Sequence, residues 1–152
     1  MGEQDSAQIR WARDSSDLQG AIGVRARVFI DEQGVPAGEE LDGRDEQALH
    51  LVALTPDGEQ VIGTLRLLID GDLAKIGRVA VDRDWRRQGI AERMLDVALG
   101  EAQVRGARRV RLASQLEVVS LYERAGFVVQ SDVFEEAGIP HVFMGRDLGG
   151  VA

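Results

Sequence analysis

A glycine-containing turn, Arg86-Arg87-Gln88-Gly89-Ile90-Ala91, combines residue types that bind phosphate groups. An apolar strand pattern ends before it at Val81, and a helical pattern of apolar residues begins at Ile90. A glycine at such a junction leaves the N–H groups of the first helical turn uncovered, and the helix dipole adds partial positive charge. Because two arginines lie on the same turn, the segment predicts a phosphate site. An ordinary helix start without a ligand is the alternative.

Two common nucleotide-binding turns do not fit this stretch. No Lys-Ser/Thr pair follows Gly89, so the turn is not a P-loop for nucleotide hydrolysis. The three-glycine spacing of a dinucleotide-binding turn is also absent. The phosphate-bearing ligand is therefore expected to be of another kind.

Tyr122 is a second candidate, and it is the only tyrosine in the chain. It lies in a helical pattern over residues 118–125, and Gly126 is placed to end that helix before a strand start at Phe127. The tyrosine is either a core aromatic whose hydroxyl finds a partner or a proton donor in a site. The pattern alone leaves both roles open.

The two segments, in this order, resemble those of the GNAT superfamily of N-acetyltransferases. Arg86–Ala91 matches the family's Arg-x-x-Gly-x-Gly/Ala segment, and Tyr122–Phe127 matches its Tyr-x-x-x-Gly-Phe segment. Arg25–Pro36 and Gly138–His141 resemble segments of the small ElaA-like and YjcF-like members. The resemblance therefore covers a core of about residues 8–147.

The resemblance implies one acetyltransferase domain over residues 1–152 with the α+β GNAT fold. The implied central sheet is mixed and mostly antiparallel, with about six to seven strands flanked by about four helices. The residue pattern adds an antiparallel meander, then a helix over 89–105 and a parallel partner strand over 109–113. Late strands over 127–134 and 141–147 are expected to close the sheet.

In the family the turn holds the pyrophosphate of acetyl-CoA, and the tyrosine protonates the departing thiolate. The resemblance thus implies acetyl-CoA as the acyl donor and no metal. The cofactor-binding residues implied by position are Val79, Ala80, Val81, Arg86, Arg87, Gln88, Gly89, Ile90, Ala91, Gln115 and Tyr122. Tyr122 is then the general acid, and the N–H of Val81 stabilises the oxyanion. Many members have asparagine where this chain has Gln115, so that contact is expected to shift.

The implied acceptor is a primary amine whose structure the sequence does not identify. A protonated amine must lose a proton before it attacks, which requires a base. Glu32, Glu40 and His141 are the candidates on the acceptor side, and a structural role is the alternative for each. A non-catalytic acyl-CoA-binding or sensing module with the same fold is the alternative to the N-acetyltransferase.

The charge distribution fits an anionic donor and a cationic acceptor. The formal net charge of -8 argues against nucleic acid as a partner. Residues 86–111 contain seven arginines and three acids, whereas residues 31–46 contain seven acids and one base. The basic segment suits cofactor phosphates and the acidic segment suits an amine, although solvated surface is the alternative for most of these side chains.

Other composition features exclude further classes. No apolar run approaches the length of a membrane span, so no membrane partner is expected. The chain has no cysteine and therefore no disulfide, thiolate metal site or acyl-cysteine intermediate. These features suit a cytoplasmic protein, and its late strands would offer an edge for a homodimer.

Overall fold

The computed structural model describes residues 6–149. Within this range the strands are β1 (Gln8–Trp11), β2 (Leu49–Leu54), β3 (Val61–Asp70), β4 (Leu73–Val81), β5 (Arg109–Gln115), β6 (Val128–Val129), β7 (Phe134–Glu136) and β8 (Ile139–Asp147). The helices are α1 (Ser15–Arg25), α2 (Ala37–Glu40), α3 (Ile90–Val104) and α4 (Val119–Arg124). A π-helical segment η1 (Ala26–Glu32) and 3₁₀ turns η2 (Asp45–Gln47), η3 (Arg83–Trp85) and η4 (Leu116–Val118) complete the order. Residues 1–5 and 150–152 of the predicted single domain lie outside the described residues, and its extent stays a prediction.

The strands of residues 6–149 form one eight-stranded sheet in the order β1-β2-β3-β4-β5-β8-β6, with β7 paired to β8. Neighbouring strands are antiparallel except β4 and β5, which are parallel. The predicted α+β class, with a mixed and mostly antiparallel sheet, is therefore confirmed, as is the parallel pair on either side of the long helix. The sheet has one strand more than expected.

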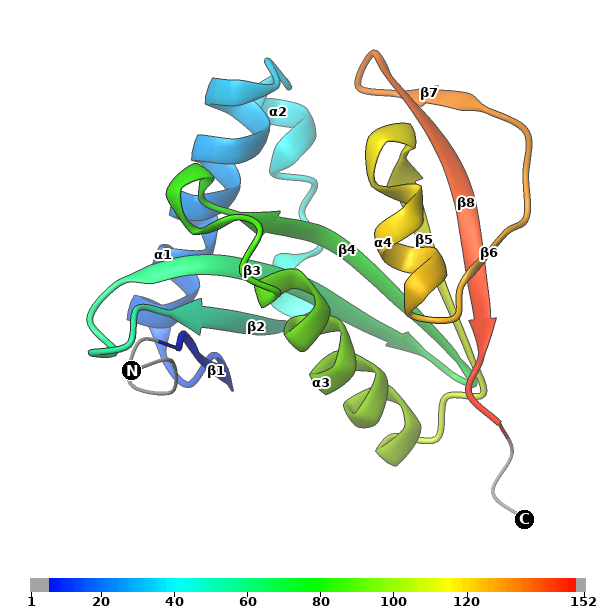
Figure 1. Cartoon of the computed structure of the whole chain (residues 1–152), viewed down its shortest axis with the longest axis horizontal. Helices are drawn as coiled ribbons and strands as arrows, with labels where there is room; N and C mark the ends of the chain where they lie inside the picture. Colours follow the sequence, from blue (N-terminus) through cyan, green and yellow to red (C-terminus); the bar gives the residue numbers. More distant parts are fainter. Residues whose placement is uncertain (1–5, 150–152) are drawn as a thin grey trace.

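Strands β4 and β5 pair at one end only. Their register joins Leu73–Lys75 to Arg109–Arg111. Beyond these residues the two strands diverge, β4 toward the α1 side and β5 together with β8 (Figure 1). Beyond the paired residues, the backbone of each strand therefore has no hydrogen-bonding partner in the other strand.

Alternation of side chains along the strands divides the core into two layers. Buried residues on one face of the sheet join Met94, Leu95 and Ala98 of α3 in one cluster. Buried residues on the other face pack against α1 through Ala21 and Val24. Helices α3 and α4 accordingly lie in front of the sheet in Figure 1, and α1 and α2 lie behind it.

The strand predicted over 127–134 is interrupted. Gln130 N–H donates to Phe143 O at 2.8 Å, but the Phe143 N–H donates to the Ser131 side-chain Oγ at 2.9 Å. Because a hydroxyl takes the place of a main-chain partner, the chain leaves the sheet after β6 and returns to it at β7. This interruption produces the additional strand.

The first helix begins at a capping aspartate and changes its type after Arg25. The Asp14 side chain accepts the Asp17 N–H as the N-cap of α1. After Arg25 the chain continues as η1, and the Val35 N–H donates to Phe29 O at 2.8 Å beyond its end. A π-helical segment widens the turn and redirects side chains, frequently at functional sites. Val28 and Phe29 of this segment line the space where β4 and β5 diverge.

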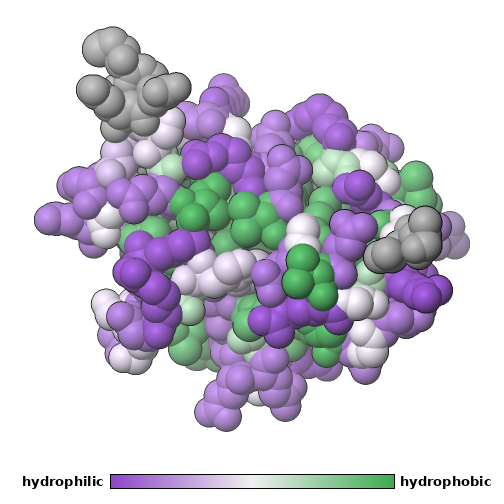
Figure 2. Space-filling view, turned by 90° about the horizontal axis from the view of Figure 1, so that it is seen from below, coloured by the Kyte–Doolittle hydropathy of each residue, from purple (hydrophilic) through white to green (hydrophobic). Residues whose placement is uncertain are grey.

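Three features of the described residues bear on the expected partners. No helix among residues 6–149 is long and apolar enough to cross a membrane. On the face seen from below, hydrophobic side chains form separate islands among hydrophilic ones (Figure 2). Strand β6 is an edge of the sheet, and its Val128 and Val129 are exposed. The use of this edge in a homodimer stays a prediction.

Candidate functional site

A cavity of about 1050 Å³ lies where β4 and β5 diverge. Its walls come from β4, β5, α4, the turn before α3, the segment around α2 and the hairpin of β7 and β8. Segments far apart in the sequence therefore meet around one space. All the predicted site residues line it except Glu32 and Gln88.

The turn before α3 leaves its backbone amides uncapped. Arg87 and Gly89 have φ values of 62° and 77°, and Gly89 is the N-cap of α3 without a side-chain hydrogen bond. A Cβ on Gly89 would meet nothing within 4 Å, so glycine serves the left-handed backbone conformation there, not close packing. The N-terminal amides and the positive dipole end of a 15-residue helix are thus available for an anion.

The two arginines of this turn have different surroundings. Arg86 Nε donates to Val81 O at 2.8 Å, and Arg86 Nη2 donates to Glu32 Oε2 at 2.6 Å. Arg86 thus fastens the turn to β4 and η1, and its hydrogen bond lowers the pKa of Glu32. Arg87 is exposed and has no ion-pair partner in the described part of the chain. Its charge is available for a ligand.

The edge of β4 offers the N–H of Val81 to the cavity. Asp82 N–H donates to Ile62 O at 2.8 Å, and hydrogen-bonded positions alternate along antiparallel strands. Val81, one position earlier, therefore points its N–H and carbonyl away from β3 and toward the diverging side. By the same alternation the backbone of Ala80 faces β3.

A β-bulge bends β4 beside the cavity. Arg78 and Val79 together oppose Leu65, and Arg78 has a φ of 52°. This conformation costs a non-glycine residue about 1–2 kcal/mol. The Arg78 side chain offsets the cost, because its Nε donates to Glu40 Oε2 at 2.8 Å and its Nη2 to Asp42 Oδ2 at 3.2 Å. The bulge redirects the strand at Val79, which lines the cavity.

A buried ion network holds the segment around α2 against the sheet. Glu40 is 2% exposed and accepts from Arg25 Nε at 2.9 Å as well as from the arginine at the bulge. Arg66 binds Asp42 at 2.8 Å and Asp45 at 3.2 Å, and its hydrogen bond holds the pKa of Asp42 well below its usual range. Since Glu40 is already shared by two guanidinium groups, the network favours a structural role for it.

Tyr122 places its ring in the core and lines the cavity. The residue is 6% exposed, and its ring packs edge to face on Phe127 with centroids 6.1 Å apart. Within residues 6–149 its hydroxyl has no hydrogen-bond partner. Burial raises the pKa of Tyr122 above its ordinary value of 10, so the hydroxyl stays protonated at neutral pH. The tyrosine can therefore act as a proton donor.

His141 offers the cavity its ring nitrogen Nε2. Its Nδ1 lies 2.6 Å from Ile139 O, and because a carbonyl only accepts, Nδ1 carries a proton, which leaves the lone pair of the neutral imidazole on Nε2. The imidazole stacks on Phe134 with centroids 6.0 Å apart. Its Nε2 is 3.9 Å from Glu136 Oε2, too far for a hydrogen bond. Among the three base candidates, His141 is the one whose basic atom is not engaged.

Two glutamines join opposite walls of the cavity. Gln115 Nε2 donates to Gln33 Oε1 at 2.9 Å, and Gln33 Nε2 donates to Gln115 Oε1 at 3.5 Å. The longer side chain of Gln115 thus reaches from the end of β5 to the segment after η1. This pairing, which we call the glutamine bridge, is a contact that sequence reasoning missed.

The remaining predicted residues lie around these groups. Ile90 is buried at the start of α3 and is followed by Ala91, and both line the cavity. Gln88 is exposed and does not line it. In residues 6–149 no group of three His, Asp or Glu side chains is placed to hold a metal ion.

The chain is similar to known proteins over nearly its whole length. The model of the acetyltransferase (GNAT) domain family matches residues 6–148. A UPF0039 protein of Mycobacterium tuberculosis is 40% identical over 144 residues, covering 90% of this chain and 89% of that protein. The uncharacterized N-acetyltransferase YjcF of Bacillus subtilis is 33% identical over 137 residues, 90% and 96% of the two chains. The crystal structure of Escherichia coli ElaA has a TM-score of 0.79 and 25% identity over 91% of this chain and 99% of that one.

Proposed function

Because the chain belongs to the acetyltransferase (GNAT) domain family, we propose that it transfers the acetyl group of acetyl-CoA to a primary amine by direct attack. The main support is that one cavity gathers three unused groups. These are the amides of the Arg86–Ala91 turn, the N–H of Val81 and the hydroxyl of Tyr122. The similarity to YjcF and ElaA agrees with the branch that the sequence resembles.

The residues present fit acetyl-CoA as the acyl donor. The uncapped amides from the turn to Ala91 would hold the pyrophosphate, with Arg87 as the free cation beside them. The backbone at Val79 would pair with the pantetheine amides as an added strand does, and Val81 would contact the thioester. Ile90 and Gln115 would line the arm. Gln88 would contribute its backbone, since its side chain lies outside the cavity.

The reaction uses each group once. The neutral amine attacks the thioester carbonyl carbon, so that a C–N bond forms and the carbonyl electrons move to oxygen. The Val81 N–H would donate to this oxyanion, an interaction typically worth about 3 kcal/mol. The C–S bond then breaks, and the Tyr122 proton passes to sulfur. Because burial raises the pKa of Tyr122, the hydroxyl keeps its proton until negative charge develops on the sulfur.

The amine proton needs an acceptor, and we assign it to His141. Glu40 is already engaged by two arginines. The hydrogen bond from Arg86 lowers the pKa of Glu32, so that carboxylate is a weak base. The His141 Nε2 keeps a free lone pair at the cavity. A His141→Gln protein is expected to lose about a hundredfold in kcat while its Kd for CoA is unchanged. If the His141→Gln protein had the kcat of the wild type, a carboxylate or a water molecule would be the base instead.

Two measurements test the proposed function. Calorimetry measures CoA binding, and thiol release from acetyl-CoA is followed with a panel of amines, with mass spectrometry of the acceptor. We expect binding and amine-dependent thiol release that matches the gain of one acetyl group. Binding without release from any amine would favour the acyl-CoA-binding module, and a folded protein that binds no CoA would overturn both.

A further inference from the structure

Apart from Glu92 in the first turn of α3, beside the phosphate turn, the carboxylates that line the cavity fall into two groups. Glu40 and Asp42 are neutralised by arginines of the buried network. Glu39, Glu117 and Glu136 line the same cavity but are exposed, and they have no arginine or lysine partner within the described range. Because these three are not neutralised by the protein, their charge is available to a ligand.

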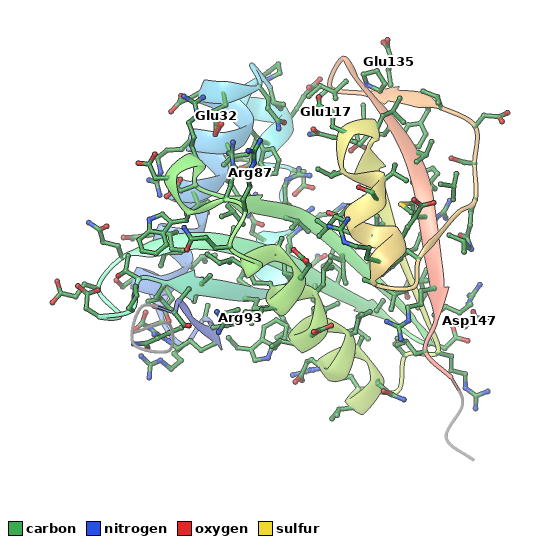
Figure 3. All side chains as sticks on the ribbon, in the orientation of Figure 1. Glu32, Arg87, Arg93, Glu117, Glu135 and Asp147 are labelled. Atoms are coloured by element: carbon green, nitrogen blue, oxygen red, sulfur yellow. The ribbon has the colours of Figure 1, made fainter. Side chains whose placement is uncertain are left out.

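The three unpaired carboxylates come from separate elements at the acceptor end. Glu39 belongs to α2, Glu117 to η4 and Glu136 to β7. The glutamine bridge links the segment before α2 to Gln115, two residues before Glu117. His141 pairs with Gln115 in the sheet and lies beside Glu136. In Figure 3, Glu117 projects from the N-terminal end of α4 toward the α2 side.

Cations are fewer at this end of the cavity. Arg44 lines it and has no ion-pair partner among residues 6–149, so it is outnumbered three to one by the carboxylates. The unpaired Arg87 belongs to the phosphate turn, and the unpaired Arg124 lies at the far end of α4 from Glu117. The acceptor end therefore attracts positive charge.

A separate observation marks the position of the reacting amine. The His141 side chain is 9% exposed, yet its Nε2 makes no hydrogen bond and the residue lines the cavity. Because this nitrogen faces the cavity without a protein partner in residues 6–149, it can accept an N–H from a ligand. The amino group of a substrate would supply that donor at the place where its proton must leave.

We propose that the acceptor is a small alkyl diamine or polyamine, an inference that rests on the acetyl transfer proposed above. One amino group lies at His141 Nε2 and receives the acetyl group. A second amino group, protonated, is held among Glu39, Glu117 and Glu136. A carboxylate in that place would be repelled, so free amino acids are poor acceptors. The site is a partly open cavity, and its concave lining suits a small molecule.

Three acceptors of matched length test this proposal. Butane-1,4-diamine, pentylamine and 4-aminobutanoate place an ammonium, a methyl and a carboxylate group at a similar distance from the reacting amine. In the thiol-release assay we expect kcat/KM to be about tenfold higher for the diamine than for the monoamine, and lowest for the amino acid. Equal values, or a preference for the amino acid, would overturn the proposal.

A double variant, Glu39→Gln with Glu117→Gln, tests the carboxylates and spares the neighbourhood of His141. We expect the preference for the diamine over the monoamine to fall to about twofold. Glu123→Gln is the matched control, because Glu123 is exposed on α4 but does not line the cavity. A double variant that keeps the full preference, or a control that loses it, would contradict the assignment.

Calorimetry separates failure of this inference from failure of the proposed transfer. Butane-1,4-diamine is titrated into the CoA-loaded wild-type protein and into the CoA-loaded double variant. Should no amine be acetylated, diamine binding that the double variant loses would still support the acceptor site. Absence of diamine binding to the wild type would overturn it.

Discussion

The two halves of the cavity are built from different chemical groups. The donor half, formed by the Arg86–Ala91 turn and the edge of β4, offers mainly backbone amides. The acceptor half, formed by the segment around α2 and the hairpin of β7 and β8, offers side chains, and a buried ion network holds its α2 segment in place. Backbone groups suit a donor that is common to a family, whereas side chains set what is particular to this chain. Substitutions in the two halves should therefore affect different properties of the protein.

Glu40→Gln is expected to produce the largest effect, because it leaves Arg25 buried with one fewer charge partner. Breaking a buried ion pair typically costs about 3–5 kcal/mol. We expect a loss of this size in the free energy of unfolding measured by urea denaturation, with CoA affinity retained in the fraction that is folded. Arg25 is 0% exposed, so water cannot replace the missing charge.

The neighbouring Glu39→Gln is the control for this prediction. Glu39 is exposed and its side chain has no ion pair in the described chain, so its replacement should change the free energy of unfolding by less than about 0.5 kcal/mol. If Glu40→Gln were as stable as wild type but had lost its turnover, Glu40 would be a catalytic base and not a structural residue.

The same division explains what the sequence could predict. The Arg86–Ala91 turn and the segment of Tyr122 are continuous, so spacing alone identifies them and the resemblance assigns their roles. The ion pair of Arg25 with Glu40 and the glutamine bridge join residues 15 and 82 positions apart, which no local pattern specifies. One signal was available, since Arg66 lies inside an apolar strand pattern where a charge must find buried partners.

The order of the core elements was predictable for a similar reason. The alternation in β3 and β4 and the helical period of α3 are local patterns. The break at Ser131 depends on the hydrogen bond from the Phe143 N–H, 12 positions away along the chain. Interruptions of regular structure were therefore missed where the contact that causes them is not sequential.

Tyr122→Phe tests whether the Tyr122 hydroxyl acts as the general acid in the acetyl transfer. The change removes one hydroxyl that has no partner in residues 6–149, so we expect stability within about 1 kcal/mol of wild type. Turnover should fall about a hundredfold, with the Kd for CoA unchanged, because the departing thiolate loses its proton donor. Unchanged kcat in steady-state thiol release would remove Tyr122 from the mechanism.

Gly89→Ala tests the backbone of the donor half without adding a clash. An alanine in the left-handed conformation costs about 1–2 kcal/mol, so the turn should relax and CoA affinity should fall about tenfold by calorimetry. Gly100→Ala in the same helix is the matched control, because its Cβ also meets nothing within 4 Å. It should stabilise the protein by about 0.5–1 kcal/mol and leave CoA binding unchanged.

Asp42→Asn is expected to have the smallest effect, and it tests the electrostatics of the acceptor half. The hydrogen bond from Arg66 lowers the pKa of Asp42 in the folded state, so this carboxylate stabilises the protein above the unfolded pKa of 3.8. That contribution is lost as the pH falls through the lower folded pKa. Because the side chain is 27% exposed, we expect a loss of about 1 kcal/mol at pH 7, together with a shallower decline in acid. Urea denaturation at pH 7 and pH 3 measures both, with the exposed Asp96→Asn as control. An unchanged acid slope would show that the Asp42 pair does not contribute to stability.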